Sequence, residues 1–228
     1  RPEMILVLEN EVDLGERYLV DEMKRHLPES EVYDYACEGG QPDLGEVDGV
    51  VVGGSTAGVY EEDDYPWMTE QKELVRELTE KSVPTLGICF GHQIINEALG
   101  GSVEHTGVRR ANLVRAELGD DPLFDGVSDV VPVLHSDRVT ETGDGMEVVG
   151  TAEYYDAFAT RHREAPVWTV QYHPEFTPKV KHLGNGWEEN HLSFDDSTAT
   201  RTLENFHELA KRRRNRKTGL GSITSRTD

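Results

Sequence analysis

Short apolar runs alternate with helix-like segments over about the first hundred residues, and this alternation constrains the fold more than any other feature. Buried strands are predicted at 4–8, 31–35, 47–52 and 82–86, and helices at 14–27, 66–81 and 93–99. Apolar residues at helical spacing favour the second helix, and Pro66 suits its first turn. Strands that alternate with helices form a parallel sheet covered on both faces, so we expect an α/β, doubly wound fold.

The pattern changes after the third helix. Shorter β-like segments follow at 113–118, 130–133, 146–151 and 157–160, before a further strand at 167–172. We expect these segments to form a small antiparallel patch attached to the mainly parallel sheet. Ligand sites of such folds lie at the carboxyl ends of the parallel strands.

Cys89 lies at one of these strand ends, between Gly87 and Gly91. A nucleophile between glycines on a sharp strand-to-helix turn forms a nucleophile elbow. The glycines permit a strained backbone and close approach of a substrate. The N–H groups at the helix start favour the thiolate, which is the reactive form of cysteine. A buried core cysteine is the commoner role for this residue type, but the glycine-flanked junction favours a nucleophile.

A base for this thiol follows the last expected strand. His173-Pro174-Glu175 comes directly after the β-rich run 167–172, and a histidine there can reach the same sheet edge as Cys89. Glu175 can hold the imidazole tautomer and stabilise the imidazolium. We therefore predict catalysis by Cys89, His173 and Glu175.

Residues 87–93 (Gly-Ile-Cys-Phe-Gly-His-Gln) and 171–175 (Gln-Tyr-His-Pro-Glu) together resemble the class I (triad-type) glutamine amidotransferases, and the match extends over roughly 4–176. The resemblance implies a flavodoxin-like sheet. It also implies an oxyanion hole formed by the backbone N–H groups of Gly54 and Phe90, which suits a carbonyl oxygen that becomes an anion.

The same resemblance implies substrate contacts. Ser136 and Asp137 lie in the turn that holds the α-amino and α-carboxylate groups of glutamine in the family, and Gln93 matches the glutamine of the elbow motif. His92 occupies a variable position and is expected to be a helix-start residue. The histidines at 182 and 191 lack metal-ligand spacing, so neither a metal nor a cofactor is expected.

Members of this family hydrolyse the glutamine side-chain amide and pass ammonia to a synthase. The sequence shows neither a phosphate-binding loop nor a nucleotide-activating domain, so we expect glutamine as substrate and, as partner, a synthase on a separate chain. The elbow and the stretch 135–140 are most similar to GMP-synthase glutaminases, which serve purine biosynthesis. Two alternatives are a partner-independent γ-glutamyl hydrolase or peptidase and a non-catalytic relative, although the intact triad argues against the latter.

The charge balance is strongly acidic. There are 44 acidic and 23 basic residues, of which 7 are lysines, and the formal net charge is −21. Such a lysine-poor surface is typical of halophilic proteins, because salt screens its self-repulsion. It argues against nucleic-acid binding. The sequence has no membrane span and two cysteines, so a cytoplasmic protein without disulfides is expected.

The C-terminal region has a different composition. A helical pattern over 197–209 leads into the basic run 211–217. We expect one amidotransferase domain over 1–210 and a basic, disordered tail over 211–228. The segment 177–196 can form a loop over the site.

Overall fold

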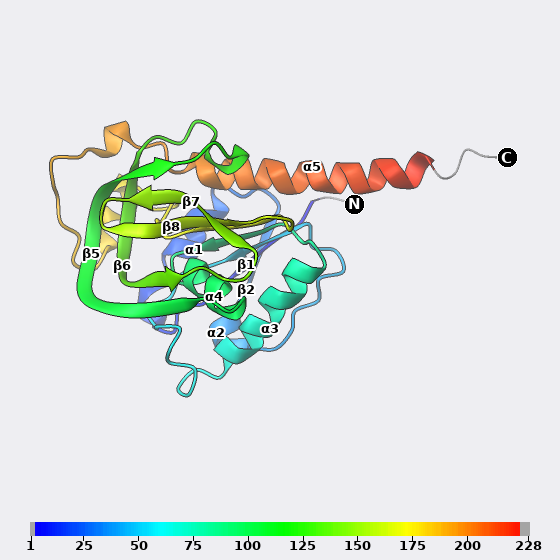
Figure 1. Cartoon of the computed structure of the whole chain (residues 1–228), viewed down its shortest axis with the longest axis horizontal. Coiled ribbons are helices and arrows are strands. Elements are labelled where there is room, and N and C mark those ends of the chain that lie inside the picture. Colours follow the sequence, from blue (N-terminus) through cyan, green and yellow to red (C-terminus); the bar gives the residue numbers. More distant parts are fainter. Residues whose placement is uncertain (1–2, 224–228) are drawn as a thin grey trace.

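A single curved sheet organises the molecule (Figure 1). The computed structural model describes residues 3–223, and within them the sheet has nine strands in the order β2-β1-β3-β4-β9-β8-β7-β5-β6. The strands are β1 (Ile5–Leu8), β2 (Ser30–Tyr33), β3 (Gly49–Val52), β4 (Thr85–Ile88), β5 (Ser102–Leu118), β6 (Val130–Glu141), β7 (Met146–Ala152), β8 (Tyr155–His162) and β9 (Val167–Val170). Strands β2, β1, β3, β4 and β9 run parallel, and the remaining pairs are antiparallel. The doubly wound α/β fold with an antiparallel patch is therefore confirmed.

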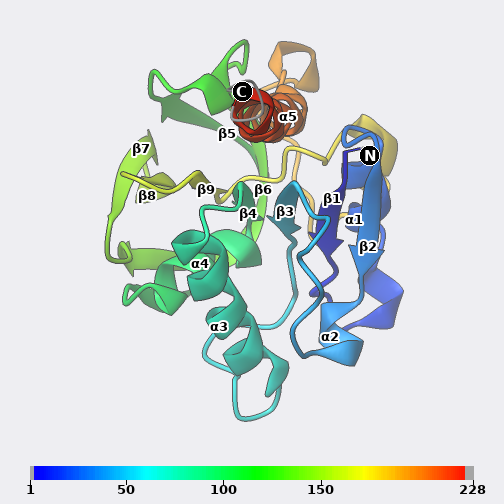
Figure 2. The ribbon, with the colours of Figure 1, turned by 90° about the vertical axis from the view of Figure 1, so that its right-hand side faces the viewer.

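Helices cover both faces of the parallel strands (Figure 2). They are α1 (Leu19–Lys24), α2 (Tyr35–Glu38), α3 (Trp67–Glu80), α4 (Phe90–Ala98) and α5 (Arg201–Ile223). Alternation along β1 explains the two faces, because successive side chains of a strand point to opposite sides. Ile5 and Val7 belong to the core cluster that includes residues of α1 and α5, whereas Leu6 and Leu8 pack in the cluster with α3 and α4.

The antiparallel strands are longer than the sequence pattern indicated. β5 has 17 residues and β6 has 12, although only 113–118 and 130–133 were expected. Most of the first half of β5 is exposed and polar, so its side chains carry no alternating apolar signal. These residues are instead held by pairing with β6, which hydrophobic periodicity does not report.

The expected helix at 14–27 is wrong in its first part. Residues Leu14–Glu16 form a short 3-10 turn, capped by the Asp13 side chain, and the α-helix begins only at Leu19. Leu14 is 70% exposed, so it does not contribute to the apolar face that its position in the pattern suggested. Cys37 lies in the short helix α2.

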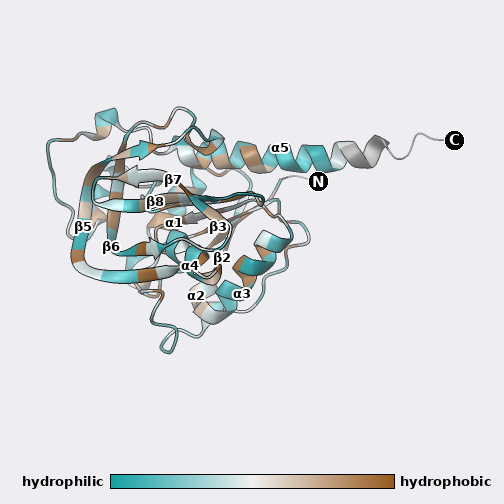
Figure 3. Cartoon of the chain, in the orientation of Figure 1, coloured by the Kyte–Doolittle hydropathy of each residue, from teal (hydrophilic) through white to brown (hydrophobic). Residues whose placement is uncertain are grey.

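The C-terminal helix, α5, continues past residue 210, where the domain was expected to end. α5 runs to Ile223, so the expectation of a disordered tail is wrong for 211–223, and 224–228 lie outside the described residues. Leu203, Phe206 and Ala210 are fully buried against the sheet. Beyond them the helix extends past the sheet and its residues are mainly hydrophilic (Figure 3). The domain boundary at 210 stays a prediction. Within 3–223, none of the helices has the length and apolar composition needed to cross a bilayer.

Candidate active site

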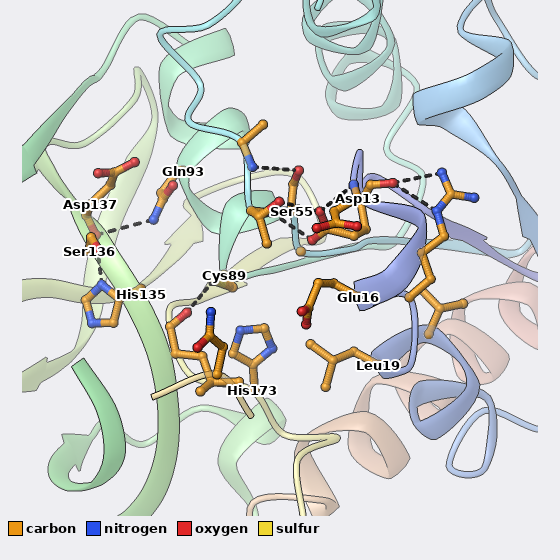
Figure 4. Close-up of a pocket in the computed structure, with 18 of the residues that line it drawn as sticks. Asp13, Glu16, Leu19, Ser55, Cys89, Gln93, His135, Ser136, Asp137 and His173 are labelled. Atoms are coloured by element: carbon orange, nitrogen blue, oxygen red, sulfur yellow. Dashed lines mark hydrogen bonds between the residues drawn. The ribbon is translucent and has the colours of Figure 1, made fainter. Parts of the chain in front are cut away.

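The carboxyl ends of four parallel strands meet around one cavity of about 450 Å³. β1 ends before Glu9, β3 before Gly53, β4 before Cys89 and β9 three residues before His173. Figure 4 shows Cys89 and His173 between Gln93 and Asp137 on one side and Asp13 and Glu16 on the other. The volume lies in the roughly 300–1,000 Å³ range of small-molecule sites. The predicted location at this sheet edge is therefore where the cavity is found.

Cys89 occupies a strained turn between β4 and α4. Its φ is 55° and its ψ is −106°, a conformation that side chains with a Cβ rarely adopt. A side chain on Gly87 would come within 2.6 Å of the Gly91 carbonyl oxygen, and one on Gly91 would overlap the Val52 carbonyl. The Cys89 N–H donates to the Val170 carbonyl at 2.9 Å, which ties the turn to β9. The elbow thus requires both glycines, as its sequence pattern predicted.

His173 and Glu175 form a buried pair beside this cysteine. The His173 Nδ1–H donates to Glu175 Oε1 at 2.5 Å, and the two side chains are 3% and 0% exposed. The backbone N–H of His173 donates to the Pro132 carbonyl at 2.9 Å, which anchors the residue to β6. Because Nδ1 is bound to the carboxylate, Nε2 is left to interact with the thiol.

The charges of this group favour an imidazolium. Burial alone lowers the pKa of His173, but the negative charges of Glu175 and Cys89, with hydrogen bonds to both, raise that pKa well above its usual value. The Cys89 Sγ lies 3.4 Å from the Leu134 carbonyl, and Gln171 Nε2 donates to the sulfur at 3.6 Å. The arrangement can therefore hold a thiolate next to a cationic histidine.

The two predicted oxyanion donors are both neighbours of Cys89. A Cβ on Gly54 would lie 3.8 Å from the Cys89 Cβ and 3.3 Å from His173 Cε1, so Gly54 borders both side chains. Phe90 is the first residue of α4, and N–H groups of a first helical turn have no intrahelical acceptor. Gly54 thus lies next to Cys89 in space and Phe90 follows it in the chain, and their roles as oxyanion donors stay predictions.

The three predicted substrate residues all line the cavity. Gln93 Nε2 donates to the Asp137 carbonyl at 3.3 Å and to Gln171 Oε1 at 3.2 Å. The Asp137 carboxylate binds His105 Nδ1 at 2.6 Å, and the Ser136 carbonyl accepts from Thr106 Oγ1 at 2.6 Å. These contacts fix the wall opposite α1, and the substrate roles of the three residues stay predictions.

Comparison with known families decides the assignment. The profile of the family "Glutamine amidotransferase class-I" matches residues 13–185, which is most of the chain. The chain belongs to this family. Among similar proteins, a GMP synthase [glutamine-hydrolyzing] of Thermosipho africanus is 32% identical over 169 residues, which are 73% of this chain and 28% of the relative. That of Staphylococcus carnosus is 31% identical over 215 residues, 91% of this chain and 39% of the relative. The chain spans well under half of these two relatives.

Solved structures show the same amidotransferase fold. A glutamine amidotransferase from Thermotoga maritima superposes with a TM-score of 0.69 at 22% identity and covers 96% of this chain and 95% of its own. A Thermoplasma acidophilum protein, provisionally assigned as one of the subunits of a GMP synthase, gives a TM-score of 0.72 at 18% identity, with 96% and 98% covered. The expected flavodoxin-like class I architecture is thus confirmed over nearly the full chain.

Two buried histidines near the amidotransferase site are neutral scaffold groups. His92 bonds Thr169 Oγ1 at 2.6 Å and the Tyr155 hydroxyl at 3.0 Å, and burial lowers its pKa to about 3. His135 donates from Nδ1 to the Asp137 carbonyl at 2.8 Å, and burial lowers its pKa to about 4. His92 therefore points into the core between α4 and the sheet, in agreement with its expected structural role.

Sequence reasoning missed the residues that follow β1. Glu9 and Glu11 line the cavity, and burial raises the pKa of each carboxyl. Glu11 Oε2 accepts from the Thr56 N–H at 2.7 Å and Oε1 accepts from its hydroxyl at 2.5 Å. The rule that located Gly54, Cys89 and His173, namely the carboxyl end of a parallel strand, also applies to β1 and would have found them.

The 177–196 segment contributes to the cavity wall. Asn185 lines the cavity, and its carbonyl accepts from Arg109 Nη2 at 3.0 Å. Trp187 stacks on Phe194, with ring centroids 5.5 Å apart, and packs in a tilted arrangement against Phe176 at 4.8 Å. The segment therefore borders the site and is held in place by its packed aromatic side chains. Within residues 3–223, no three His, Cys, Asp or Glu side chains are arranged to hold a metal ion.

Proposed function

We propose that this chain is a glutaminase that hydrolyses the side-chain amide of glutamine through Cys89, His173 and Glu175. The observation that carries the proposal is the strained Cys89 elbow next to the buried His173–Glu175 pair, at the floor of a cavity sized for a small molecule. Family membership supports the same chemistry.

In the proposed reaction, the Cys89 thiolate attacks the amide carbon and a C–S bond forms. His173 gives its Nε2 proton to the leaving nitrogen, the C–N bond breaks, and ammonia departs from a γ-glutamyl thioester. His173 then removes a proton from water, and the hydroxide releases glutamate and restores the thiolate. Glu175 keeps the imidazole oriented and balances its charge, without itself taking the proton.

The oxyanion of each tetrahedral intermediate is proposed to accept hydrogen bonds from Gly54 and Phe90. Such donors are worth more in a dry site, because they need not reorganise as charge develops. Gln93, Ser136 and Asp137 are proposed to hold the α-amino and α-carboxylate groups of the substrate, since they form the opposite wall of the same cavity.

The acceptor of the ammonia is proposed to be bound by a separate, GMP-synthase-like chain. The two glutamine-hydrolysing GMP synthases described above are longer than this chain, which matches 28% and 39% of their lengths. The fold contains no further domain within 3–223 that could activate a nucleotide. Hydrolysis by the isolated chain should therefore be slow and should rise when the synthase and its activated acceptor are present.

We further propose a cytoplasmic protein adapted to high salt. The formal net charge of −21 and the low number of lysines support salt adaptation. Both cysteines are unpaired, with Cys37 exposed and Cys89 buried, which fits a reducing compartment.

Ammonia release from glutamine, measured for the wild type and for Cys89→Ala, tests the activity. The variant should fold and lose turnover, and a glutamine-directed electrophile should label Cys89 in the wild type. Cys37→Ala is the matched control because it removes the other, exposed thiol, and it should keep full turnover. Normal turnover by Cys89→Ala would end the proposal. Hydrolysis of γ-glutamyl peptides with glutamine ignored would instead favour a γ-glutamyl hydrolase.

A further inference from the structure

A buried pair of amide side chains lies directly behind the Gly53–Gly54 turn. Asn10 Nδ2 donates to Gln71 Oε1 at 2.9 Å, and Gln71 Nε2 donates back to Asn10 Oδ1 at 2.7 Å. Both side chains are 0% exposed. Asn10 follows β1 and Gln71 lies on α3, so the pair joins a strand end to the helix that covers it.

The second Nδ2 proton of Asn10 has a specific acceptor. It is donated to the Gly53 carbonyl oxygen at 3.1 Å. The N–H of Gly53 donates to the Leu8 carbonyl at 3.2 Å, so both polar groups of Gly53 are bound. A side chain at Gly53 would come within 2.6 Å of that Leu8 oxygen, which explains the glycine. The turn is therefore held against β1 from one side.

Peptide geometry transmits this restraint to the next residue. In a planar trans peptide the C=O and the following N–H point in opposite directions. The bond from Asn10 to the Gly53 oxygen therefore fixes the direction of the Gly54 N–H, away from the amide pair. Gly54 itself borders Cys89 and His173, whereas Asn10 lies behind the turn.

A second anchor holds the far end of the same loop. The Glu11 carboxylate accepts from both the N–H and the hydroxyl of Thr56. Two consecutive residues after β1 thus bind the 53–56 loop at its two ends. Asn10 controls the peptide orientation at Gly54, and Glu11 limits where the rest of the loop can move.

We propose that Asn10, fixed by Gln71, is a positioning residue that directs the Gly54 N–H into the oxyanion hole. The inference rests on the proposed function, because it assigns a cause to one of the two oxyanion donors. Asn10 touches neither substrate nor thiol. Its effect is confined to steps in which negative charge develops on an oxygen next to Cys89 Sγ.

Two reactions of Cys89 separate this role from a general structural one. Attack on glutamine develops an oxyanion, whereas alkylation by iodoacetamide displaces iodide and develops no charge on the oxygen at this site. Asn10→Ala should lower kcat for glutamine about 10²-fold and leave KM and the alkylation rate constant within about threefold. The affinity for glutamate γ-semialdehyde, which forms a thiohemiacetal with Cys89, should fall by the same factor as kcat/KM.

Gln71→Ala should give a smaller loss of the same kind, because it leaves Asn10 in place but unrestrained. The double variant should be no worse than Asn10→Ala, since Gln71 acts only through Asn10. Gln71→Ala also carries the test if Asn10→Ala does not fold. Asn96→Ala is the matched control: it removes a fully buried amide that binds the His92 carbonyl at 2.9 Å, and it should leave the ratio of the two reactions unchanged.

The inference is overturned if alkylation and turnover fall together in Asn10→Ala, or if neither changes, or if Asn96→Ala alters the ratio equally. A wild type that hydrolyses neither glutamine nor γ-glutamyl peptides would overturn the proposed function instead. Binding of the aldehyde needs no turnover, so it still tests the Gly54 donor in that case.

Discussion

Alanine substitutions at two adjacent glycines should affect different properties of this protein. Gly53→Ala should lower its stability, and Gly54→Ala should lower its activity. Gly53 faces the Leu8 carbonyl of the neighbouring strand, and a Cβ there would lie 2.6 Å from that backbone oxygen. The oxygen is fixed in the sheet and cannot move aside. Overpacking against backbone costs about 1–3 kcal/mol. For a chain of this size each kcal/mol lowers Tm by roughly 2–4 °C, so Gly53→Ala should lower it by about 2–12 °C.

Gly54→Ala should change the stability little and the activity strongly. The φ of Gly54 is not positive, so alanine is compatible with its backbone, and this substitution restricts the unfolded chain by about 0.4–1 kcal/mol. Its Cβ would lie 3.3 Å from His173 Cε1, which requires a shift of only a few tenths of an ångström. The two contributions oppose each other, so Tm should change by less than about 4 °C.

Activity should respond strongly to that small shift. The new methyl group would border His173 and the Cβ of Cys89, and it would sit on the residue proposed as an oxyanion donor. Losing one oxyanion donor costs about 10²–10³ in kcat, and a displacement of about 1 Å can cost 10². Gly54→Ala should therefore lose about two orders of magnitude in glutamine hydrolysis. Calorimetric unfolding and an ammonia assay on both variants measure the contrast. Wild-type turnover in Gly54→Ala, or an equal loss of Tm in both variants, would refute the reasoning.

Three other outcomes follow from the charges. His173→Ala should lose several orders of magnitude in rate, and Glu175→Gln should lose less. Because the Glu175 charge raises the pKa of His173, Glu175→Gln should also shift the alkaline limit of kcat/KM to lower pH. A larger loss for Glu175→Gln than for His173→Ala would reverse the assigned roles. The pKa of His92 is about 3 in the fold and about 6.5 when unfolded, so below pH 6.5 the unfolded state binds a proton that the folded state excludes. The unfolding free energy of the wild type should therefore fall as the pH is lowered. His92→Gln should make this fall less steep, by about 1.4 kcal/mol per pH unit between about pH 4 and 6, as measured by urea titration. An unchanged slope would show that His92 is protonated in the folded state. Because molar salt shortens the Debye length to about 3 Å, Tm should rise from dilute buffer to molar potassium chloride, and a flat or falling midpoint would contradict salt adaptation.

The sequence was most informative where a residue's role depends on local geometry. The elbow at Cys89 needs glycines on both sides, because a side chain at either position would collide with neighbouring backbone atoms. The two glycines can be read directly from the sequence. His173 and Glu175 are two positions apart, so one turn brings their side chains together. The alternating strands and helices likewise follow from periodicity, which local patterns report directly.

Roles that depend on contacts between distant segments were not visible. Asn10 and Gln71 are 61 positions apart, and neither has a pattern that distinguishes it from a solvated polar residue. The first half of β5 is polar and exposed, so its pairing with β6 leaves no periodic signal. The end of α5 could not be predicted either, since a run of basic residues is compatible with both a helix and a disordered tail.

The position of β9 has a consequence for the order in which the protein matures. β9 pairs with β4 on one side and β8 on the other, yet within residues 3–223 it is the last strand along the chain. Cys89 emerges from the ribosome 84 residues ahead of His173. Until β9 inserts, β4 lacks a neighbour on that side and Cys89 lacks its proposed base, His173. The proposed pairing of Cys89 with His173 therefore requires β9 to have joined the sheet, so the proposed nucleophile gains its base only at a late stage of folding.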